Sequence, residues 1–264
     1  MQNKIKLIED TKAIKGCSFI YAPKGQALEY SELASNPYSG CGHKCADCYV
    51  PKALRMKSRE LFDSQAIERP TYRKGLLRDA KKYDDAKTEA QVMLSFTTDP
   101  YHPFDTSATR FAIETISNTH GLGFCTLTKG GTRSLRDIDL FRRDKDAFAT
   151  TMTSLDDRFS QKWESGAALP NDRIEAIKKF HEKGIFTWVS LEPTLDVDAS
   201  LAIIERTHEF VDLFKIGRVN YMPMTKTTDW EDYTHRIIDL CDRLGVAHYI
   251  KKDLQPYLPE GYNN

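Results

Sequence analysis

The sequence predicts an α/β protein built on a parallel sheet, in the form of a full or partial TIM-like barrel. Two observations support this fold class. Segments rich in strand-forming residues alternate with amphipathic helical segments along most of the chain, which is the pattern of βαβ units. The length of 264 residues suits one large domain of barrel size. In such barrels the functional side chains lie just after each strand.

The expected elements form six or seven strand–helix units, with the first strand somewhere before Cys41. The expected strands are residues 91–97, 123–128, 147–153, 185–191, 211–216 and 246–250. The expected helices are residues 106–118, 133–143, 171–183, 197–208 and 229–243. In the helix at 171–183, Asn171 is a candidate N-cap, apolar residues recur at Ile174, Ile177 and Phe180, and Gly184 is a stop signal.

Composition is that of an ordinary globular protein. Hydrophobic residues make up 40% and charged residues 29% of the chain. Thirty-eight basic and 38 acidic residues cancel, so bulk charge does not indicate nucleic-acid binding, although a local basic stripe would. The chain start lacks an apolar signal-peptide segment, and no stretch reaches the roughly 18 apolar residues of a membrane span. We therefore expect a cytoplasmic protein with no membrane partner, whose thiols stay reduced.

The clearest chemical signal is a group of three cysteines. Cys41, Cys45 and Cys48 have the spacing CxxxCxxC within residues 36–51, where prolines and glycines indicate a loop. Thiolates at such a spacing select zinc or an iron–sulfur cluster. A [4Fe–4S] cluster is usually held by four cysteines. Three local ligands would therefore leave one iron open to bind and activate a small molecule.

The alternative for this loop is a structural zinc ion with a histidine as fourth ligand, and His43 and His102 are the candidates. Zinc sites more often use paired CxxC motifs, and the chain has no second CxxC. Cys125 in an expected strand and Cys241 on an apolar helix stripe are interpreted as small core residues. Cys17 is left without an assignment.

A triplet of this spacing followed by an aromatic residue, here Tyr49, resembles the signature of the radical S-adenosylmethionine (radical SAM) superfamily. More closely, the chain resembles the branch of spore photoproduct lyase and the DNA repair photolyase-like radical SAM proteins. The segments that carry the resemblance come in order along the chain, at residues 20–51, 95–103, 127–140, 151–157 and 190–193. Such an ordered set is far more specific than the triplet alone.

The resemblance implies a partial (β/α)6 TIM-like barrel of the radical SAM type in a single domain over residues 1–264. Residues 1–35 would form an N-terminal extension, 36–250 the barrel core and 251–264 a C-terminal tail. The resemblance also implies a [4Fe–4S] cluster whose open iron binds S-adenosyl-L-methionine (SAM), and an electron donor such as flavodoxin or ferredoxin. Reductive cleavage of SAM would give a 5′-deoxyadenosyl radical that abstracts hydrogen from a substrate. We therefore expect an enzyme of the lyase or oxidoreductase type.

Roles of individual residues follow from the same resemblance. Tyr49 is expected beside the adenosyl group, Thr98 and Asp99 near the methionyl and ribose groups, and Thr151 at a further ribose- or methionyl-binding position. Lys129 is expected to pair with the cofactor carboxylate. Each residue also has an ordinary interpretation as a packing, turn, loop or strand residue. We favour the functional roles because these residues follow the triplet or the expected strands.

The chain departs from the lyase where the lyase has a hydrogen-donating cysteine, because Phe96 takes that position. This difference argues against repair of a thymine photodimer and for another substrate of the same cofactor. Besides Tyr49, the candidate catalytic residue is Glu192, which ends an expected strand among apolar residues and could bind the cofactor or the substrate. Glu164 and Lys251 are expected on the solvated surface.

Three functions agree with these residues. The first is a radical SAM enzyme acting on a nucleobase or nucleic acid, and the second is one acting on a protein or small metabolite. The third is a non-catalytic zinc- or cluster-binding module that binds nucleic acid. A basic track for nucleic acid would come from Lys44, Lys52, Arg55, Lys57 and Arg59, although these residues equally suit a solvated helix face.

Overall fold

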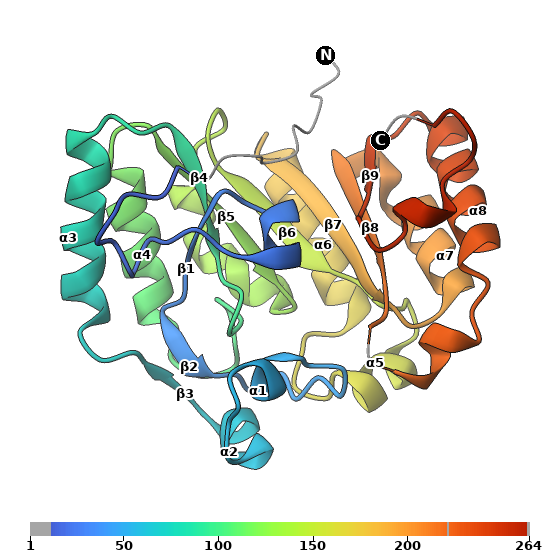
Figure 1. Cartoon of the computed structure of the whole chain (residues 1–264), viewed down its shortest axis with the longest axis horizontal. Coiled ribbons are helices and arrows are strands. Elements are labelled where there is room, and N and C mark those ends of the chain that lie inside the picture. Colours follow the sequence, from blue (N-terminus) through green and yellow to red (C-terminus); the bar gives the residue numbers. More distant parts are fainter. Residues whose placement is uncertain (1–11, 221, 263–264) are drawn as a thin grey trace.

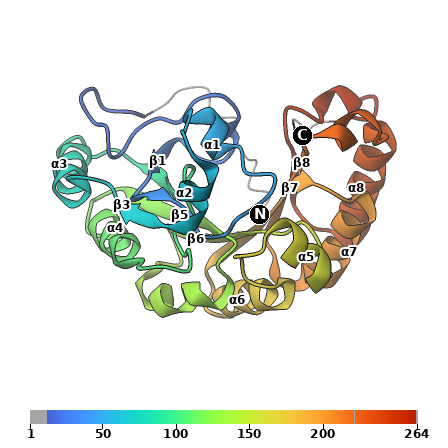
Figure 2. The same cartoon turned by 90° about the horizontal axis from the view of Figure 1, so that it is seen from below.

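The computed structural model describes residues 12–220 and 222–262, and in these residues the main element is a parallel sheet of seven strands (Figure 1). The strand order is β1-β4-β5-β6-β7-β8-β9, and every neighbouring pair is parallel. The sheet curves without closing, since β1 and β9 are its two edges. Helices cover its convex face, as the view from below shows (Figure 2). The expected α/β fold with a partial TIM-like barrel is therefore confirmed.

The sheet consists of seven strands connected mainly by helices. Its strands are β1 (Leu33–Ser35), β4 (Ala90–Leu94), β5 (Leu122–Thr128), β6 (Ala147–Thr151), β7 (Phe186–Thr194), β8 (Leu213–Arg218) and β9 (His248–Ile250). The helices between them are α3 (Tyr72–Asp85), α4 (Ser107–Ser117), the 3-10 helix η2 (Gly131–Leu140), α6 (Pro170–Glu182), α7 (Val197–Thr207) and α8 (Trp230–Leu244). None of the described helices combines the length and the apolar composition that crossing a membrane requires.

Smaller elements gather at the carboxyl end of the sheet, at the bottom of Figure 1. They are the antiparallel pair β2 (Tyr38–Gly40) and β3 (Ala66–Glu68) and the short helices α1 (Val50–Ala53), α2 (Arg59–Ser64) and α5 (Asp157–Trp163). Four short 3-10 helices complete the described elements: η1 (Gly25–Glu29), η3 (His208–Phe210), η4 (Pro223–Lys226) and η5 (Gln255–Tyr257).

Each expected strand and helix has a counterpart, and the differences have local causes. The helix expected at 133–143 is the 3-10 helix η2. Helix α6 has Leu169 and not Asn171 as its N-cap, because Pro170 takes the first helical position, which suits its fixed φ. Helix α3 was not expected, since the buried Gly75 and Asp79 interrupt its apolar pattern.

Two apolar clusters lie on the two faces of the sheet. The larger packs strand residues such as Phe124 and Phe148 against the helices, and Phe148 stacks on Phe180 of α6 with 3.8 Å between ring centroids. The smaller consists of the alternate residues of the same strands, among them Cys125, and lies on the concave face. Cys125 and Cys241 are both fully buried, which confirms their interpretation as core residues.

The segment before β1 spans the open side of the sheet. Tyr21 exchanges two backbone hydrogen bonds with Ala34 of β1. Glu29 of η1 accepts hydrogen bonds from the Tyr249 hydroxyl of β9 (3.1 Å) and from the Lys252 amide (2.7 Å). Residues 21–29 therefore connect the two edge strands. The sheet also begins three residues before the expected core boundary at 36, while residues 1–11 and 263–264 of the expected extension and tail lie outside the described residues.

Candidate cluster and cofactor site

The three cysteines of the triplet lie on one loop between β2 and α1, at the carboxyl end of the main sheet. Gly40 begins the loop with a φ of +93°, and a β-carbon there would lie 2.1 Å from the carbonyl oxygen of Gln65. Only glycine fits this close approach. Within the loop, the Cys48 amide donates to the Cys45 carbonyl at 3.1 Å. We call residues 41–48 the cysteine loop.

The segment after α5 holds the cysteine loop from the other side. Cys45 and Glu164 form an isolated antiparallel bridge. The Gly166 amide donates to the His43 carbonyl at 2.9 Å, and a β-carbon on Gly166 would lie 2.0 Å from the Gly42 carbonyl oxygen. Two backbone segments that are far apart in sequence therefore fix the loop.

The thiols fit a metal cluster better than free nucleophiles or a single zinc ion. Burial raises the pKa of the Cys41 thiol to about 12 and also raises the pKa values of Cys45 and Cys48, so a bound metal is needed to give thiolates at neutral pH. Thiolates around one zinc ion, each at about 2.3 Å, lie about 3.8 Å apart. The three sulfurs here do not all lie within 4.8 Å of one another. A larger centre with several irons fits this spread donor set.

The two histidines considered as zinc ligands have other contacts. His43 Nδ1 lies 3.2 Å from Asp99 Oδ2, and its Nε2 lies 2.9 Å from a guanidinium nitrogen of Arg133. His102 accepts the Phe104 amide at its Nδ1 (3.2 Å). Among the described residues, neither histidine joins the cysteines in a group compact enough for one ion. The geometry therefore does not support a zinc site of three cysteines and one histidine.

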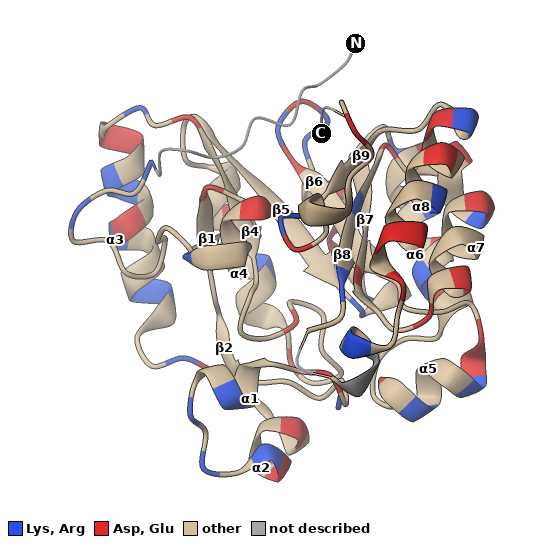
Figure 3. Ribbon diagram, turned by 45° about the vertical axis from the view of Figure 1, so that its right-hand side comes forward, with Lys and Arg blue, Asp and Glu red and all other residues tan. Residues whose placement is uncertain are grey.

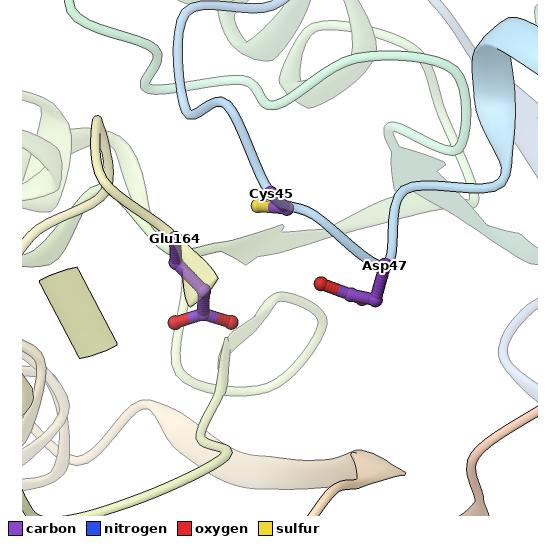
Figure 4. Close-up of side chains that lie close together, drawn as sticks. All are labelled: Cys45, Asp47 and Glu164. Atoms are coloured by element: carbon purple, nitrogen blue, oxygen red, sulfur yellow. The ribbon is translucent and has the colours of Figure 1, made fainter. Parts of the chain in front are cut away.

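A buried ion-pair network lies beside Cys45. Lys129, just after β5, lies 2.6 Å from Glu164 and 3.6 Å from the Cys45 sulfur, and Glu164 also lies 2.6 Å from Arg173 of α6. Burial opposes ionisation of Glu164, but the two cations lower its pKa to about 2. Figure 4 shows the Asp47 carboxylate pointing towards Glu164 from the cysteine loop.

The expectation that Glu164 lies on the solvated surface is wrong, since only 1% of the residue is exposed. The reason is its pairing with Lys129 and Arg173, because a buried carboxylate is stable only when cations or donors surround it. Lys129 follows β5 and Arg173 lies on α6, so the pairing depends on how separate elements pack and cannot be seen in the local sequence around Glu164.

Asp99 serves as an acceptor between two strand ends. Its oxygens accept hydrogen bonds from the Thr128 hydroxyl (2.5 Å) and the Lys129 amide (2.8 Å), and it pairs with His43. Burial opposes ionisation, but the His43 charge and these hydrogen bonds lower the pKa of Asp99 below its ordinary range. Asp99 therefore joins the ends of β4 and β5 to the cysteine loop.

The two threonines of the expected cofactor site lie at the same edge of the sheet. The Thr98 hydroxyl donates to the Gly40 carbonyl at 2.6 Å and so ties the end of β4 to the start of the cysteine loop. Thr151 ends β6, and its carbonyl accepts a hydrogen bond from Arg173 at 2.9 Å. The structure thus brings Thr98, Thr151, Asp99 and Lys129 to adjacent strand ends around the cysteines, and their cofactor roles stay predictions.

A family model described as the radical SAM superfamily matches residues 35–211, which contain the cysteine loop and these strand ends. The chain belongs to the radical SAM superfamily. A search of curated protein sequences finds no significant match.

Solved structures share the fold of this radical SAM chain. Spore photoproduct lyase complexed with dinucleoside spore photoproduct matches with a TM-score of 0.67 and 16% identity, over 90% of this chain and 81% of the lyase. SuiB of Streptococcus suis bound to S-adenosylmethionine matches with a TM-score of 0.62 and 11% identity, over 88% of this chain and 53% of SuiB. SuiB bound to the precursor peptide SuiA gives a TM-score of 0.62 at 13% identity, over 88% and 51%. The chain thus spans about half the length of SuiB.

Tyr49 of this radical SAM protein follows the last cysteine and is 54% exposed. Its hydroxyl donates to the Phe96 carbonyl at 2.8 Å. The ring of Phe96 lies 6.2 Å from that of Tyr30, centroid to centroid, in an edge-on arrangement. Tyr49 thus stands next to the cysteines with an open ring face, which suits contact with a planar group.

Glu192 lies in β7 and forms an ion pair with Lys251, which follows β9. The Tyr30 hydroxyl donates to the same carboxylate oxygen of Glu192 at 2.5 Å. Lys251 is only 1% exposed, so the expectation of a surface position is wrong. The pairing depends on two strands on either side of β8, and no local pattern in the sequence indicates that they meet.

Proposed function

We propose that this radical SAM protein holds a [4Fe–4S] cluster on Cys41, Cys45 and Cys48, binds SAM beside it and abstracts a hydrogen atom from a substrate. The observation that carries the proposal is the cysteine loop: three sulfurs spread on one fixed loop at the carboxyl end of the sheet, where such barrels place their sites. When bound, the cluster would supply the electron that cleaves SAM to methionine and a 5′-deoxyadenosyl radical. An electron donor such as flavodoxin or ferredoxin would reduce the cluster.

The chain's own residues would bind and orient the cofactor. Lys129 presents a buried cation to the cofactor carboxylate, and Glu164 holds that cation in place at 2.6 Å. Tyr49 offers its exposed ring to the adenosyl group. Thr98 and Thr151 would contact the methionyl and ribose groups from neighbouring strand ends. Asp99, between the ends of β4 and β5, would lie beside the methionyl and ribose groups as well.

The test is anaerobic purification followed by assays of iron, sulfide and zinc, and of 5′-deoxyadenosine after reduction in the presence of SAM. The expected result is iron and sulfide in equal amounts with 5′-deoxyadenosine formed. Cys45→Ala should lose both, while the matched variant Cys17→Ala should keep both, because Cys17 lies outside the cysteine loop. Stoichiometric zinc without sulfide, or full cleavage of SAM by Cys45→Ala, would overturn the proposal in favour of the non-catalytic module.

We further propose a nucleobase or nucleic acid as the substrate. Lys44, Lys52, Arg55 and Lys57 are exposed next to the cysteines, and Arg59 forms an ion pair with Asp63 at 2.7 Å. In Figure 3 the ribbon is blue, for Lys and Arg, at positions on α1, on α2 and on the loop between them. The fold shared with spore photoproduct lyase supports this substrate class, and the fold shared with SuiB supports a peptide as the second candidate. Deuterium-labelled oligonucleotides and peptides decide between them, by which class transfers label into 5′-deoxyadenosine.

A further inference from the structure

A second polar group lies on the concave face, at the carboxyl ends of β7, β8 and β9. Its centre is Glu192, whose Oε2 accepts hydrogen bonds from the Tyr30 hydroxyl and from Lys251 Nζ. The Lys251 ammonium lies 4.5 Å from the centroid of the Tyr30 ring and is itself buried. Glu192 is therefore held in one orientation by a segment before the sheet and by a residue after the last strand.

The backbone of β8 is shaped to admit this pair. A β-carbon on Gly217 would lie 2.9 Å from Lys251 Cδ and 3.2 Å from Glu192 Cδ. Both distances are tighter than ordinary van der Waals contact. Glycine at this position thus lets two long side chains from the flanking strands meet over β8.

The Glu192 site faces the proposed cofactor position. Tyr49 follows Cys48 directly and so marks the side of the cysteine loop where the cofactor is proposed to bind. Phe96 connects the two regions, because its carbonyl accepts from Tyr49 and its ring contacts Tyr30. Figure 2 shows β7 and β8 on one side of the open part of the molecule and α1, which follows the cysteine loop, on the other side. A ligand bound at Glu192 would therefore lie near a radical formed beside Tyr49.

One oxygen of Glu192 is available to such a ligand. Both described hydrogen bonds go to Oε2, none of the described residues donates to Oε1, and the side chain keeps 17% of its surface exposed. Lys251 lies between two carboxylates, Glu192 and Glu29, the latter at 3.8 Å, so this group carries no net positive charge to attract an anion. The site therefore suits a neutral ligand that donates a hydrogen bond and has a planar face for the nearby aromatic rings.

We propose that Glu192, held by Tyr30 and Lys251, positions the substrate by accepting a hydrogen bond from an N–H on the edge of a nucleobase. Enzymes that act on bases hold them between aromatic side chains and recognise the hydrogen-bonding edge. A site built to pair with a donor discriminates strongly against a ligand that lacks it. This inference rests on the proposed function and names the residue that selects its substrate.

The test compares two probes on anaerobic, cluster-loaded protein with SAM present: thymidine, and N3-methylthymidine, which lacks the N–H donor. Wild type should bind thymidine at least tenfold more tightly by calorimetry, and Glu192→Gln should reduce this discrimination to less than threefold. Gly217→Ala, which displaces the Glu192–Lys251 pair without changing charge, should do the same. Glu182→Gln is the matched control, because Glu182 lies on α6 with its side chain 47% exposed, and it should keep the wild-type discrimination.

Equal binding of the two probes by wild type, no binding of thymidine at all, or full discrimination by both Glu192→Gln and Gly217→Ala would each overturn the inference. Formation of 5′-deoxyadenosine without substrate is measured in parallel. Its presence together with a failed binding test rejects the Glu192 role and leaves the proposed function intact. Its absence in wild type rejects the proposed function, whatever the probes show.

Discussion

Asp99 shows at the scale of one residue how a strand-end position can have two roles. The sequence indicates a contact with the cofactor, whereas the structure uses its oxygens to join Thr128, Lys129 and His43. We expect Asp99→Asn to lower the free energy of unfolding by about 1–3 kcal/mol, because the amide nitrogen would face a backbone donor. Urea unfolding measures this change, with the exposed Asp139→Asn as control. Unchanged stability with a raised KM for SAM would instead support a direct cofactor contact.

Lys215 is a buried cation on the concave face and predicts a pH dependence. Burial, with the Lys251 charge, lowers its pKa to about 8, although Cys125 and Glu29 act in the other direction. Between pH 8 and its ordinary value near 10.5 the unfolded chain binds more protons, so stability rises with pH. The rise amounts to at most about 3 kcal/mol. Lys215→Met should lack it.

Urea unfolding of the metal-free protein at pH 7.5 and pH 10 measures the Lys215 effect as the difference between variant and wild type. Other groups titrate in the same range and cancel in this difference as far as the variant leaves them unchanged. Parallel pH profiles for wild type and Lys215→Met would show that Lys215 keeps its ordinary pKa in the fold.

At the scale of elements, one buried side chain of helix α3 binds three consecutive residues of the segment before β1. The fully buried Asp79 accepts backbone hydrogen bonds from Ser18, Phe19 and Ile20 at 2.8, 2.6 and 3.2 Å. We expect Asp79→Asn to lower the free energy of unfolding by about 2 kcal/mol, because hydrogen bonds to a charged acceptor are the stronger ones. Amide hydrogen exchange at residues 18–20 should speed up. Asp85→Asn, on the exposed side of the same helix, should change neither.

The elements that the sequence predicts well are those whose burial follows a simple period. Helix α8 buries Trp230, Tyr233, Ile237 and Cys241 on one stripe, as the apolar pattern over residues 229–243 indicates. Helix α3 could not be predicted in this way. Its polar residue Asp79 does not face solvent but is buried, where it binds the backbone of another segment. A buried polar residue removes the periodic signal wherever its partner comes from elsewhere in the chain.

At the scale of the whole molecule, the residues of the site also fall into those that the sequence predicts and those that it does not. The cysteines could be predicted because all three lie on one loop, and the strand-end residues could be predicted because parallel strands end at one edge. Glu164 and Lys251 could not, since Glu164 is buried against Lys129, which follows β5, and Lys251 is buried against Glu192 of β7. Composition cannot distinguish a buried charge from an exposed one.

Net charge at this scale sets how nucleic acid would bind. Thirty-eight basic and 38 acidic residues cancel, so affinity must come from the exposed Lys44, Arg55 and Lys57 beside the cysteine loop. Replacing all three with alanine should reduce the slope of log affinity against log salt by about 2 for single-stranded DNA, since each phosphate contact contributes about 0.7. The matched control replaces three exposed cations on the outer helices: Lys81, Lys179 and Arg243. Both variants carry the same net charge. Equal slopes would therefore mean that the charge of the whole molecule, and not the cations beside the cysteine loop, attracts the DNA.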